Sequence, residues 1–251
     1  HNLLPRRKFL AGAAALAVPG CVSLPISDPK LVGETSLKER AAKKGLVFGA
    51  MVLQHFLRDT NYANILIRDV GMLVPGIVLK WGRLEREQGR VVFYASDKVS
   101  SFAARHKMAM RGHTLLWHNN IPEWLPSALS RAGPGDAANI ITKHIGEVAG
   151  HYRGRMHSWD VVNEPIEPND GRADGLRDNL FLKAIGPDYI DLAFHAAAEA
   201  DPSARLVLNE YGLATGWNSG RKRRAATLRN LEKLLKKGVP VHALGIQGHL
   251  N

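Results

Sequence analysis

An apolar run of this chain ends in an amide, a carboxylate and a proline, at Asn163-Glu164-Pro165. The preceding Val161 and Val162 favour a buried strand, and the proline ends that strand because it has no N–H to donate. Asn163 and Glu164 are therefore predicted to lie where a strand opens into a loop. Parallel α/β proteins place their chemistry at this end of their strands, so Glu164 is the first candidate for a catalytic group.

Six short apolar runs recur from residue 46 onward, separated by longer segments of helical character. This alternation is typical of successive strand–helix units in a parallel α/β protein. Because polar residues stand at the ends of the runs, the pattern predicts a TIM (β/α)8 barrel. The predicted strands are Leu46–Val52, Met72–Lys80, Met108–His118, His157–Glu164, Arg205–Tyr211 and Ala243–Leu250.

The predicted barrel is incomplete. A (β/α)8 barrel typically needs about 250 residues, and only residues 36–251 remain once the N-terminal segment is excluded. The sequence starts at His1 and stops at Asn251, directly after the sixth predicted strand. We therefore expect residues 36–251 to be a partial catalytic barrel of about six βα units, with both ends of the sequence cut.

Residues 1–35 are predicted to be an export leader and linker. The string Pro5-Arg6-Arg7-Lys8-Phe9-Leu10, followed by apolar residues 11–18, is typical of a twin-arginine signal. The apolar run is too short to span a bilayer, so we expect no stable membrane span. Cys21, the only cysteine, follows in a string that loosely resembles a lipoprotein cleavage box, which leaves a lipid anchor as an open alternative. We expect a periplasmic or extracellular protein.

The composition supports a large core but gives no sign of a nucleic-acid partner. The chain is 45% hydrophobic and carries a net charge of +11, from 34 basic and 23 acidic residues. Basic residues gather in the leader and at Arg221–Arg224. The latter begin a predicted helix with an apolar face at Ala225, Leu228, Leu231 and Leu235, and the basic residues form its solvated face. No aromatic residues interleave with these charges, as binding of single strands would require.

The residues at the ends of the predicted strands have the chemistry of a sugar site. Tryptophan faces stack on the apolar faces of pyranose rings, and amides and charged groups bind hydroxyls. The second to sixth predicted strands end in Lys80-Trp81, Arg111–Asn119, Asn163-Glu164, Asn209-Glu210-Tyr211 and Gln247-Gly248-His249. A phosphate site would need a Gly-rich loop, and none is visible in the sequence.

Histidines near the third predicted strand offer a metal site as an alternative. However, His113 and His118 are five residues apart and would point to opposite faces of a strand. The sequence has no His-Glu-x-x-His string and no cysteine cluster. We therefore predict neither a metal nor another cofactor.

Together these stretches resemble glycoside hydrolase family 10, the endo-β-1,4-xylanase family. The Arg-Gly-His-Thr-Leu-x-Trp-His string from Arg111 and the Trp-Asp-x-x-Asn-Glu string from Trp159 are the most specific matches. The resemblance covers nearly everything from about residue 45 to the end. The other matching stretches are Leu79-Lys80-Trp81, Leu176–Asn179 with Phe181, Ile185–Ile190, Ala200-Asp201-Pro202, Asn209-Glu210-Tyr211 and Gly245–Leu250.

The resemblance implies an eight-stranded barrel that cleaves the xylan backbone with retention of configuration. Retention requires two carboxylates about 5–5.5 Å apart, one acting as acid/base and one as nucleophile. By motif position, Glu164 resembles the acid/base, and Asn163 the residue that binds the sugar 2-hydroxyl. His249 matches the histidine that hydrogen-bonds the nucleophile. The positions that match glycone-binding residues are Lys80, His113, Trp117 and Gln247. Xylan or xylo-oligosaccharides are then the partners, and we expect the complete protein to be a monomer.

Two features depart from the family pattern. The family nucleophile is a glutamate on strand seven, and residues up to Asn251 do not supply it. Glu210 belongs to the fifth predicted strand, where the family carries an acidic residue that is not the nucleophile, so we expect the 251-residue chain alone to be inactive. Before Lys80, the chain has Pro75-Gly76-Ile77 where the family commonly has Pro-Glu-Asn, which should weaken the distal glycone subsite.

Two other functions remain open. One is a related barrel glycosidase that acts on another β-1,4-glycan, which the altered Gly76-Ile77 string keeps in play. The other is a non-catalytic protein that binds xylan or a similar β-glycan without turnover. Comparing xylan with cellulose and mannan would separate the first from a xylanase. The second predicts binding of xylo-oligosaccharides by this chain without turnover, whereas a truncated barrel predicts poor folding, and thermal melting with and without xylo-oligosaccharide would distinguish these two.

Overall fold

The structure, a computed structural model, describes residues 35–249. From Ser36 onward the chain forms one compact unit. The predicted export leader and Cys21 lie outside the described residues, as does the end of the sixth predicted strand at Leu250. Within residues 35–249, every helix is too short or too polar to cross a membrane.

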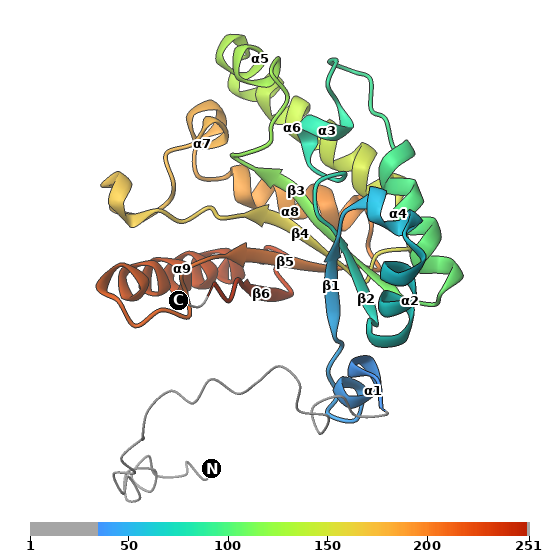
Figure 1. Cartoon of the computed structure of the whole chain (residues 1–251). Helices are drawn as coiled ribbons and strands as arrows, with labels where there is room; N and C mark the ends of the chain where they lie inside the picture. Colours follow the sequence, from blue (N-terminus) through green and yellow to red (C-terminus); the bar gives the residue numbers. More distant parts are fainter. Residues whose placement is uncertain (1–34, 250–251) are drawn as a thin grey trace, which may run out of the picture. The chain divides into compact units, whose positions relative to one another are not determined.

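A single sheet of six strands organises this unit, and its strands follow one another in chain order (Figure 1). All five neighbouring pairs are parallel, so the carboxyl ends of the strands share one edge. This is the arrangement predicted for six consecutive units of a (β/α)8 barrel. The strands are β1 (Gly49–Val52), β2 (Met72–Pro75), β3 (Ala109–Trp117), β4 (Ser158–Asn163), β5 (Arg205–Glu210) and β6 (Ala243–Ile246).

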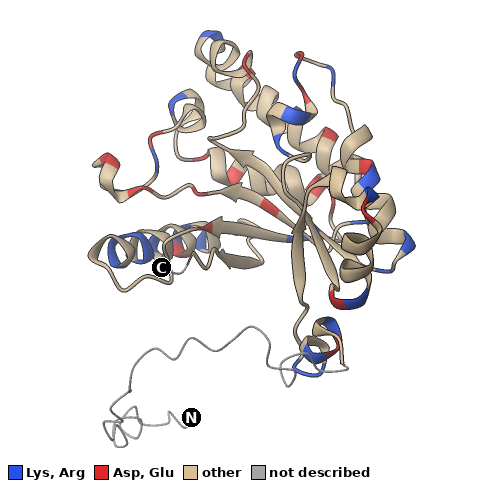
Figure 2. Cartoon of the chain, viewed as in Figure 1, with Lys and Arg blue, Asp and Glu red and all other residues tan. Residues whose placement is uncertain are grey.

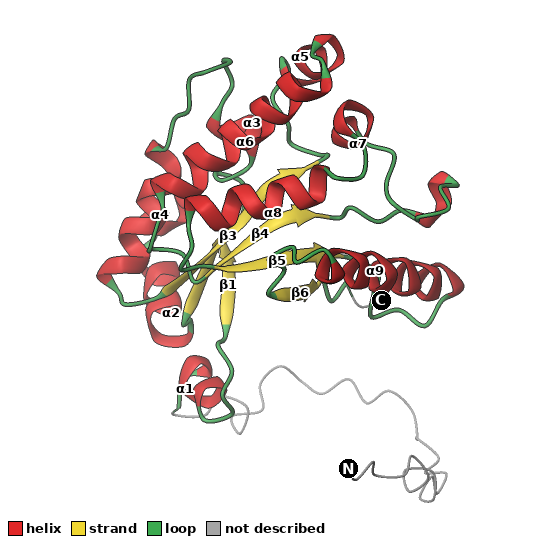
Figure 3. Ribbon diagram, turned by 180° about the vertical axis from the view of Figure 1, so that it is seen from behind, coloured by secondary structure: helices red, strands yellow, loops and turns green. Residues whose placement is uncertain are grey.

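Helices connect the strands, and α6 and α8 lie along one face of the sheet (Figure 3). The longer helices are α2 (Thr60–Asp69), α4 (Tyr94–Arg105), α6 (Pro134–His151), α8 (Tyr189–Ala200) and α9 (Asn218–Lys236). The shorter ones are α1 (Leu37–Ala42), α3 (Trp81–Leu84), α5 (Leu125–Arg131) and α7 (Leu180–Ile185), with the 3-10 turns η1 (Gln54–Arg58) and η2 (Pro168–Asp170). Side chains cap the N-termini of several helices. At the start of α2, for example, the Asp59 side chain accepts hydrogen bonds from the backbone N–H groups of Asn61 and Tyr62.

The second predicted strand was drawn too long. Strand β2 ends at Pro75, and Lys80 lies five residues further on, as the N-cap of helix α3. Pro75 has no N–H for a further ladder bond, and residues 76–80 form a bend and turn instead. The prediction included Val78 and Leu79 because they are apolar, but they pack against the core from a turn and not from a strand.

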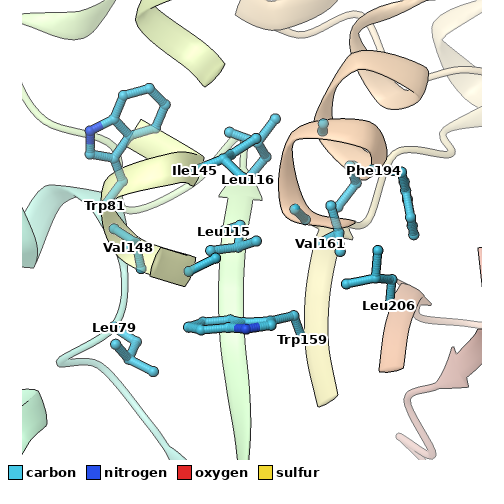
Figure 4. Close-up of a cluster of buried hydrophobic side chains, with 14 of the residues drawn as sticks. Leu79, Trp81, Leu115, Leu116, Ile145, Val148, Trp159, Val161, Phe194 and Leu206 are labelled. Atoms are coloured by element: carbon cyan, nitrogen blue, oxygen red, sulfur yellow. The ribbon is translucent and has the colours of Figure 1, made fainter. Parts of the chain in front are cut away.

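Trp159 is the largest fully buried side chain of the core within the described residues, and it has no exposed surface (Figure 4). Its indole extends from β4 across β3, where its register partner is Gly112. A Cβ atom at Gly112 would meet the indole Cε3 and Cζ3 atoms at 2.0 and 2.2 Å, so only glycine leaves room for the ring. The indole Nε1 is satisfied by Asp201 after helix α8, at 3.1 Å.

Gly112→Ala should therefore destabilise the fold by about 1–3 kcal/mol, because the added methyl group overpacks a fully buried aromatic ring. Gly146→Ala is the matched control, since Gly146 lies inside helix α6 with no atom within 4 Å of an added Cβ. The control should gain up to about 1 kcal/mol from helix propensity. Urea denaturation of both variants checks the prediction, and a Gly112→Ala variant as stable as the parent would contradict it.

Helix α9 corrects the predicted positions of its apolar face and its solvated basic face. Arg223 is buried, whereas Leu228 and Leu235, expected on the apolar stripe, are 61% and 57% exposed. The buried positions of the helix are Gly220, Arg223, Ala226, Thr227 and Leu234. The stripe was misplaced because the pattern of apolar residues gives no sign that an arginine is buried with carboxylate partners.

Candidate active site

Residues at the carboxyl ends of three neighbouring strands lie in one row. Asn163 on β4 pairs in register with Trp117 on β3 and with Asn209 on β5. Glu164 follows immediately, and its backbone N–H donates to the Asn209 carbonyl oxygen at 2.8 Å. Its φ of 57° lies in the left-handed region, which is uncommon for a residue other than glycine and is found preferentially at functional sites.

The carboxylate of Glu164 is held by donors from two strands. Trp117 Nε1 donates to Glu164 Oε2 at 2.9 Å, and Gln247 Nε2, just past β6, donates to Glu164 Oε1 at 3.2 Å. The Oδ1 atom of Asn163 accepts from Asn209 Nδ2 at 2.8 Å and from Gln247 Nε2 at 3.2 Å. These bonds fix the orientation of both groups at the edge of the sheet, and the Asn163 NH2 group donates to no other described residue.

Lys80 reaches the same place from the loop before α3. Its Nζ lies 4.8 Å from the centre of the Trp117 ring, although only 5% of Lys80 is exposed. Burial lowers the pKa of Lys80 to about 8, against the opposing attraction of Asp160 and Glu164. The ammonium group is thus near enough to Asp160 and Glu164 for both charges to act on its pKa, and it reaches the site from a loop and not from a strand.

His113 is held by a buried aspartate that sequence reasoning did not single out. Asp160 Oδ2 lies 2.8 Å from His113 Nδ1, and Arg111 Nη2 donates to Asp160 Oδ1 at 2.5 Å. A neutral His113 that donates Nδ1–H to this carboxylate presents Nε2 as an acceptor for a ligand. The signal for Asp160 was a carboxylate inside an otherwise apolar strand.

His249 is linked to the site through Gln247. Its Nε2 lies 3.0 Å from Gln247 Oε1, while the other end of the Gln247 amide binds Asn163 and Glu164. His249 is exposed at the edge of the described residues. All seven candidate residues therefore belong to one connected region. His113 is connected through Asp160, whose negative charge attracts the ammonium group of Lys80.

Glu210 has a geometry unsuited to a nucleophile. It has no exposed surface, and its oxygens accept from the backbone N–H groups of Ile166 at 3.0 Å and Tyr211 at 2.9 Å. Arg223 Nη1 lies 3.6 Å from Glu210 Oε1. Burial raises the pKa of Glu210 to about 7, despite these hydrogen bonds and the arginine. A carboxylate turned into the protein in this way is a structural group.

A set of side chains clamps the segment that follows Glu164. Arg177 Nε donates to the Glu164 carbonyl oxygen at 2.9 Å, and Arg223 donates to the carbonyl oxygen of Ile166. Arg223 Nη2 also donates to Glu167 Oε2 at 2.8 Å, and Tyr211 Oη donates to the same oxygen at 3.0 Å. Burial alone would raise the pKa of Glu167, but the bonds from Arg223 and Tyr211 lower it below its usual value. These contacts hold the left-handed backbone at Glu164 in place.

Gly76, in the loop after β2, has little space for a side chain. A Cβ atom at Gly76 would meet Met51 Sδ at 2.5 Å and Leu53 Cδ2 at 3.1 Å. A longer side chain at position 76 therefore requires Met51, which is itself exposed on β1, to move.

Within residues 35–249, no group of three or more His, Cys, Asp or Glu side chains is placed to hold a metal ion.

The chain is similar to a well-defined group of known proteins. The model of glycosyl hydrolase family 10 matches residues 36–251. Endo-1,4-beta-xylanase 3 of Hypocrea jecorina is 35% identical over 86% of this chain and 60% of its own length. Endo-1,4-beta-xylanase B of Thermotoga neapolitana is 31% identical over 95% of this chain and 66% of its own length.

Solved structures give the same result for the fold. Xylanase 10B from Thermotoga petrophila RKU-1 in complex with xylobiose superposes with a TM-score of 0.78 at 31% identity, covering 86% of this chain and 64% of that one. A family 10 protein from Paenibacillus barcinonensis gives a TM-score of 0.77 at 34% identity, with the same coverage. The chain thus spans about 60–65% of the length of these relatives, and the prediction of an incomplete TIM barrel is confirmed.

Proposed function

This chain belongs to glycosyl hydrolase family 10, and we propose that it contributes the acid/base side of a retaining endo-β-1,4-xylanase site. The observation that carries the proposal is the Glu164 carboxylate, which two side-chain donors hold beside Asn163 and Lys80. Xylan is proposed as the substrate because the similar proteins are xylanases, one of them described in complex with xylobiose.

In the proposed reaction, Glu164 first donates a proton to the glycosidic oxygen that leaves. It then takes a proton from the water that cleaves the covalent glycosyl intermediate. Trp117 and Gln247 orient its two oxygens, so the carboxyl group needs no reorganisation between the two steps. Asn163 is proposed to bind the sugar 2-hydroxyl, and Lys80, His113, Trp117 and Gln247 the glycone. His249 is proposed to hydrogen-bond the nucleophile.

The reaction requires a second carboxylate about 5 Å from the first. Among the described residues, the buried carboxylates near this site are Asp160, which binds Arg111 and His113, and Glu210, whose oxygens bind backbone N–H groups. We therefore propose that residues 1–251 alone bind xylo-oligosaccharides but do not hydrolyse xylan. The complete site would form when a strand that carries the nucleophile joins the sheet beside β6.

The test uses the 251-residue chain and a chimera that joins it to the C-terminal segment of a family 10 xylanase. We expect the chimera to release reducing sugar from xylan, with much less from cellulose and mannan. The chain alone should bind xylotriose in calorimetry without turnover. Equal turnover of cellulose or mannan by the chimera would favour the related glycosidase, and binding by a chimera without turnover would favour a glycan-binding protein.

Lys80→Met should weaken xylotriose binding about tenfold, because a hydrogen bond from a charged group is worth about 1.5–3 kcal/mol. Its melting temperature should not fall, since the variant no longer has to bury an ammonium group. Parent affinity should decline as the pH rises through about 8, where Lys80 loses its proton, and the variant should show no such decline.

Calorimetry between pH 6 and 9 measures both effects. Lys143→Met is the control, because Lys143 lies exposed on α6 and pairs only with Glu147 in its own helix. A parent and a Lys80→Met variant with the same affinity and the same pH profile would remove Lys80 from the glycone site.

The export signal of residues 1–35 and the periplasmic or extracellular location remain proposals that rest on the leader string. Expression of the chain with and without these residues, followed by cell fractionation, tests them. Growth with a labelled fatty acid in the same experiment tests whether Cys21 is lipidated.

A further inference from the structure

An exposed tryptophan stands on the loop that leads from β5 into α9. Trp217 is 71% exposed, whereas Trp81 and Trp159 are buried. Its loop leaves β5 directly after Asn209 and Glu210, on the side toward which the strand arrows point (Figure 1). A single exposed aromatic residue is ordinary on a protein surface, so a ligand is indicated only by what lies around Trp217.

The loop that carries Trp217 is fixed to the first turns of α9. Arg224 Nη1 donates to the carbonyl oxygens of Leu213 at 2.8 Å and Thr215 at 2.6 Å. Gly220 packs so closely that an added Cβ would meet Thr215 Oγ1 at 2.2 Å and the Gly212 oxygen at 2.9 Å. The tryptophan is therefore presented by a preorganised loop, which lowers the entropy that binding would cost.

Two exposed cations, without carboxylate partners among the described residues, follow Trp217 in the first turns of α9. From Tyr211 to Leu231 the sequence has five Arg or Lys residues and no Asp or Glu. Arg221 and Lys222 are exposed, and within residues 35–249 no carboxylate lies within 4 Å of either charge. Figure 2 shows the basic residues along α9. Trp217 and Arg221 are one helical turn apart, with the Arg221 N–H donating to the Trp217 carbonyl oxygen at 3.1 Å, so their side chains share one side.

The loop that carries Trp217 begins beside the candidate site, because it follows Asn209 and Glu210 and Asn209 Nδ2 donates to Asn163 Oδ1 at 2.8 Å. Arg223 follows Lys222 directly in the sequence, and it contacts Glu167, three residues after Glu164. A polysaccharide bound at Glu164 that extends along this end of the sheet can therefore reach the patch formed by Trp217, Arg221 and Lys222. A flat indole face suits a pyranose ring, and cations without carboxylate partners suit a carboxylate on the ligand.

Resting on the proposed function, we propose that the Trp217 patch binds β-1,4-xylan that carries uronic acid side groups. The indole stacks on a sugar ring, while Arg221 and Lys222 pair with the uronate carboxylate. Nucleic acid fits less well, because one tryptophan does not provide the series of stacking rings that single strands use.

The test compares two ligands with the same backbone: glucuronoxylan, and the same xylan after its uronic acids have been reduced to neutral sugars. Affinity electrophoresis and calorimetry at low salt measure binding by the 251-residue chain. The parent should bind glucuronoxylan at least tenfold more tightly, and added salt should remove most of the difference. Arg221→Gln/Lys222→Gln should abolish the preference, and Trp217→Ala should weaken binding of both xylans several-fold.

Arg229→Gln/Lys233→Gln is the matched control, because it removes two exposed charges from the same helix further along. It should keep the preference for glucuronoxylan, and unchanged melting temperatures show that all variants are folded. Equal parent affinity for the two xylans would overturn the inference and leave the proposed function standing. Equal losses in both double variants, or competition by DNA as strong as by glucuronoxylan, would also overturn it. A parent that binds neither xylan would overturn the proposed function itself.

Discussion

Glu164→Gln should lower turnover of xylan by about 10²–10⁴-fold in the chimera that supplies a nucleophile, because that range is typical for loss of a general acid/base. The amide has nearly the same shape as the carboxyl group, so the hydrogen bond from Trp117 to the side-chain oxygen can persist. Binding of xylotriose should therefore change little, and the loss should appear in kcat.

Substrates that need no proton donor distinguish loss of the acid/base group from a general loss of activity in Glu164→Gln. An aryl xylobioside with a strongly acidic phenol needs no proton donor, so its first step should survive and the glycosyl intermediate should accumulate. Azide attacks that intermediate without a general base, and should restore turnover with the β-glycosyl azide as product. Glu199→Gln, an exposed change on α8, should leave all these rates unchanged. A uniform loss on every substrate without azide rescue would contradict the acid/base role.

The sequence was informative about the strand ends because one physical rule governs them. Parallel strands bring their carboxyl ends to one edge, so Trp117, Asn163 and Gln247 were predicted to meet, and they contact Glu164 or one another. The rule needs only strand order and the residue at which each strand ends. Pro165 marks that point after β4, where the predicted and observed strand ends differ by one residue.

What the sequence did not predict depends on contacts between distant loops. Lys80 enters the site from a turn, because Pro75 ends β2 early while apolar residues continue beyond it. Asp160 and Arg223 are buried ionic groups, and a buried charge has no periodic signal in a single sequence. Its position depends on partners such as His113 and Glu210, 47 residues away and 13 residues away respectively.

Arg223→Met should destabilise the fold by about 3–5 kcal/mol at pH 8, because it leaves the fully buried carboxylate of Glu210 without its cation. The loss should be smaller at pH 5. The pKa of Glu210 is raised to about 7 from its ordinary 4.5, so at pH 5 the folded protein holds this group neutral. Arg223 lowers the pKa of Glu210, so the pKa of Glu210 should rise further in Arg223→Met. The pH range in which Glu210 takes up a proton on folding should therefore extend to higher pH.

The sign follows from proton binding. Between about pH 4.5 and 7 the folded state binds more protons at Glu210 than the unfolded state, so this group makes the parent less stable as the pH rises through that range. In Arg223→Met the decline should continue above pH 7. Arg223→Met/Glu210→Gln should lack this extra decline, and what it still loses reports the bonds to Glu167 and to the Ile166 carbonyl oxygen. Urea denaturation at pH 5, 7 and 8 measures these differences, with the exposed change Arg229→Met as control. If Arg223→Met lost the same stability at pH 5 and pH 8, the ion pair with Glu210 would not be what Arg223 provides, and the clamp on the segment after Glu164 would rest on its hydrogen bonds alone.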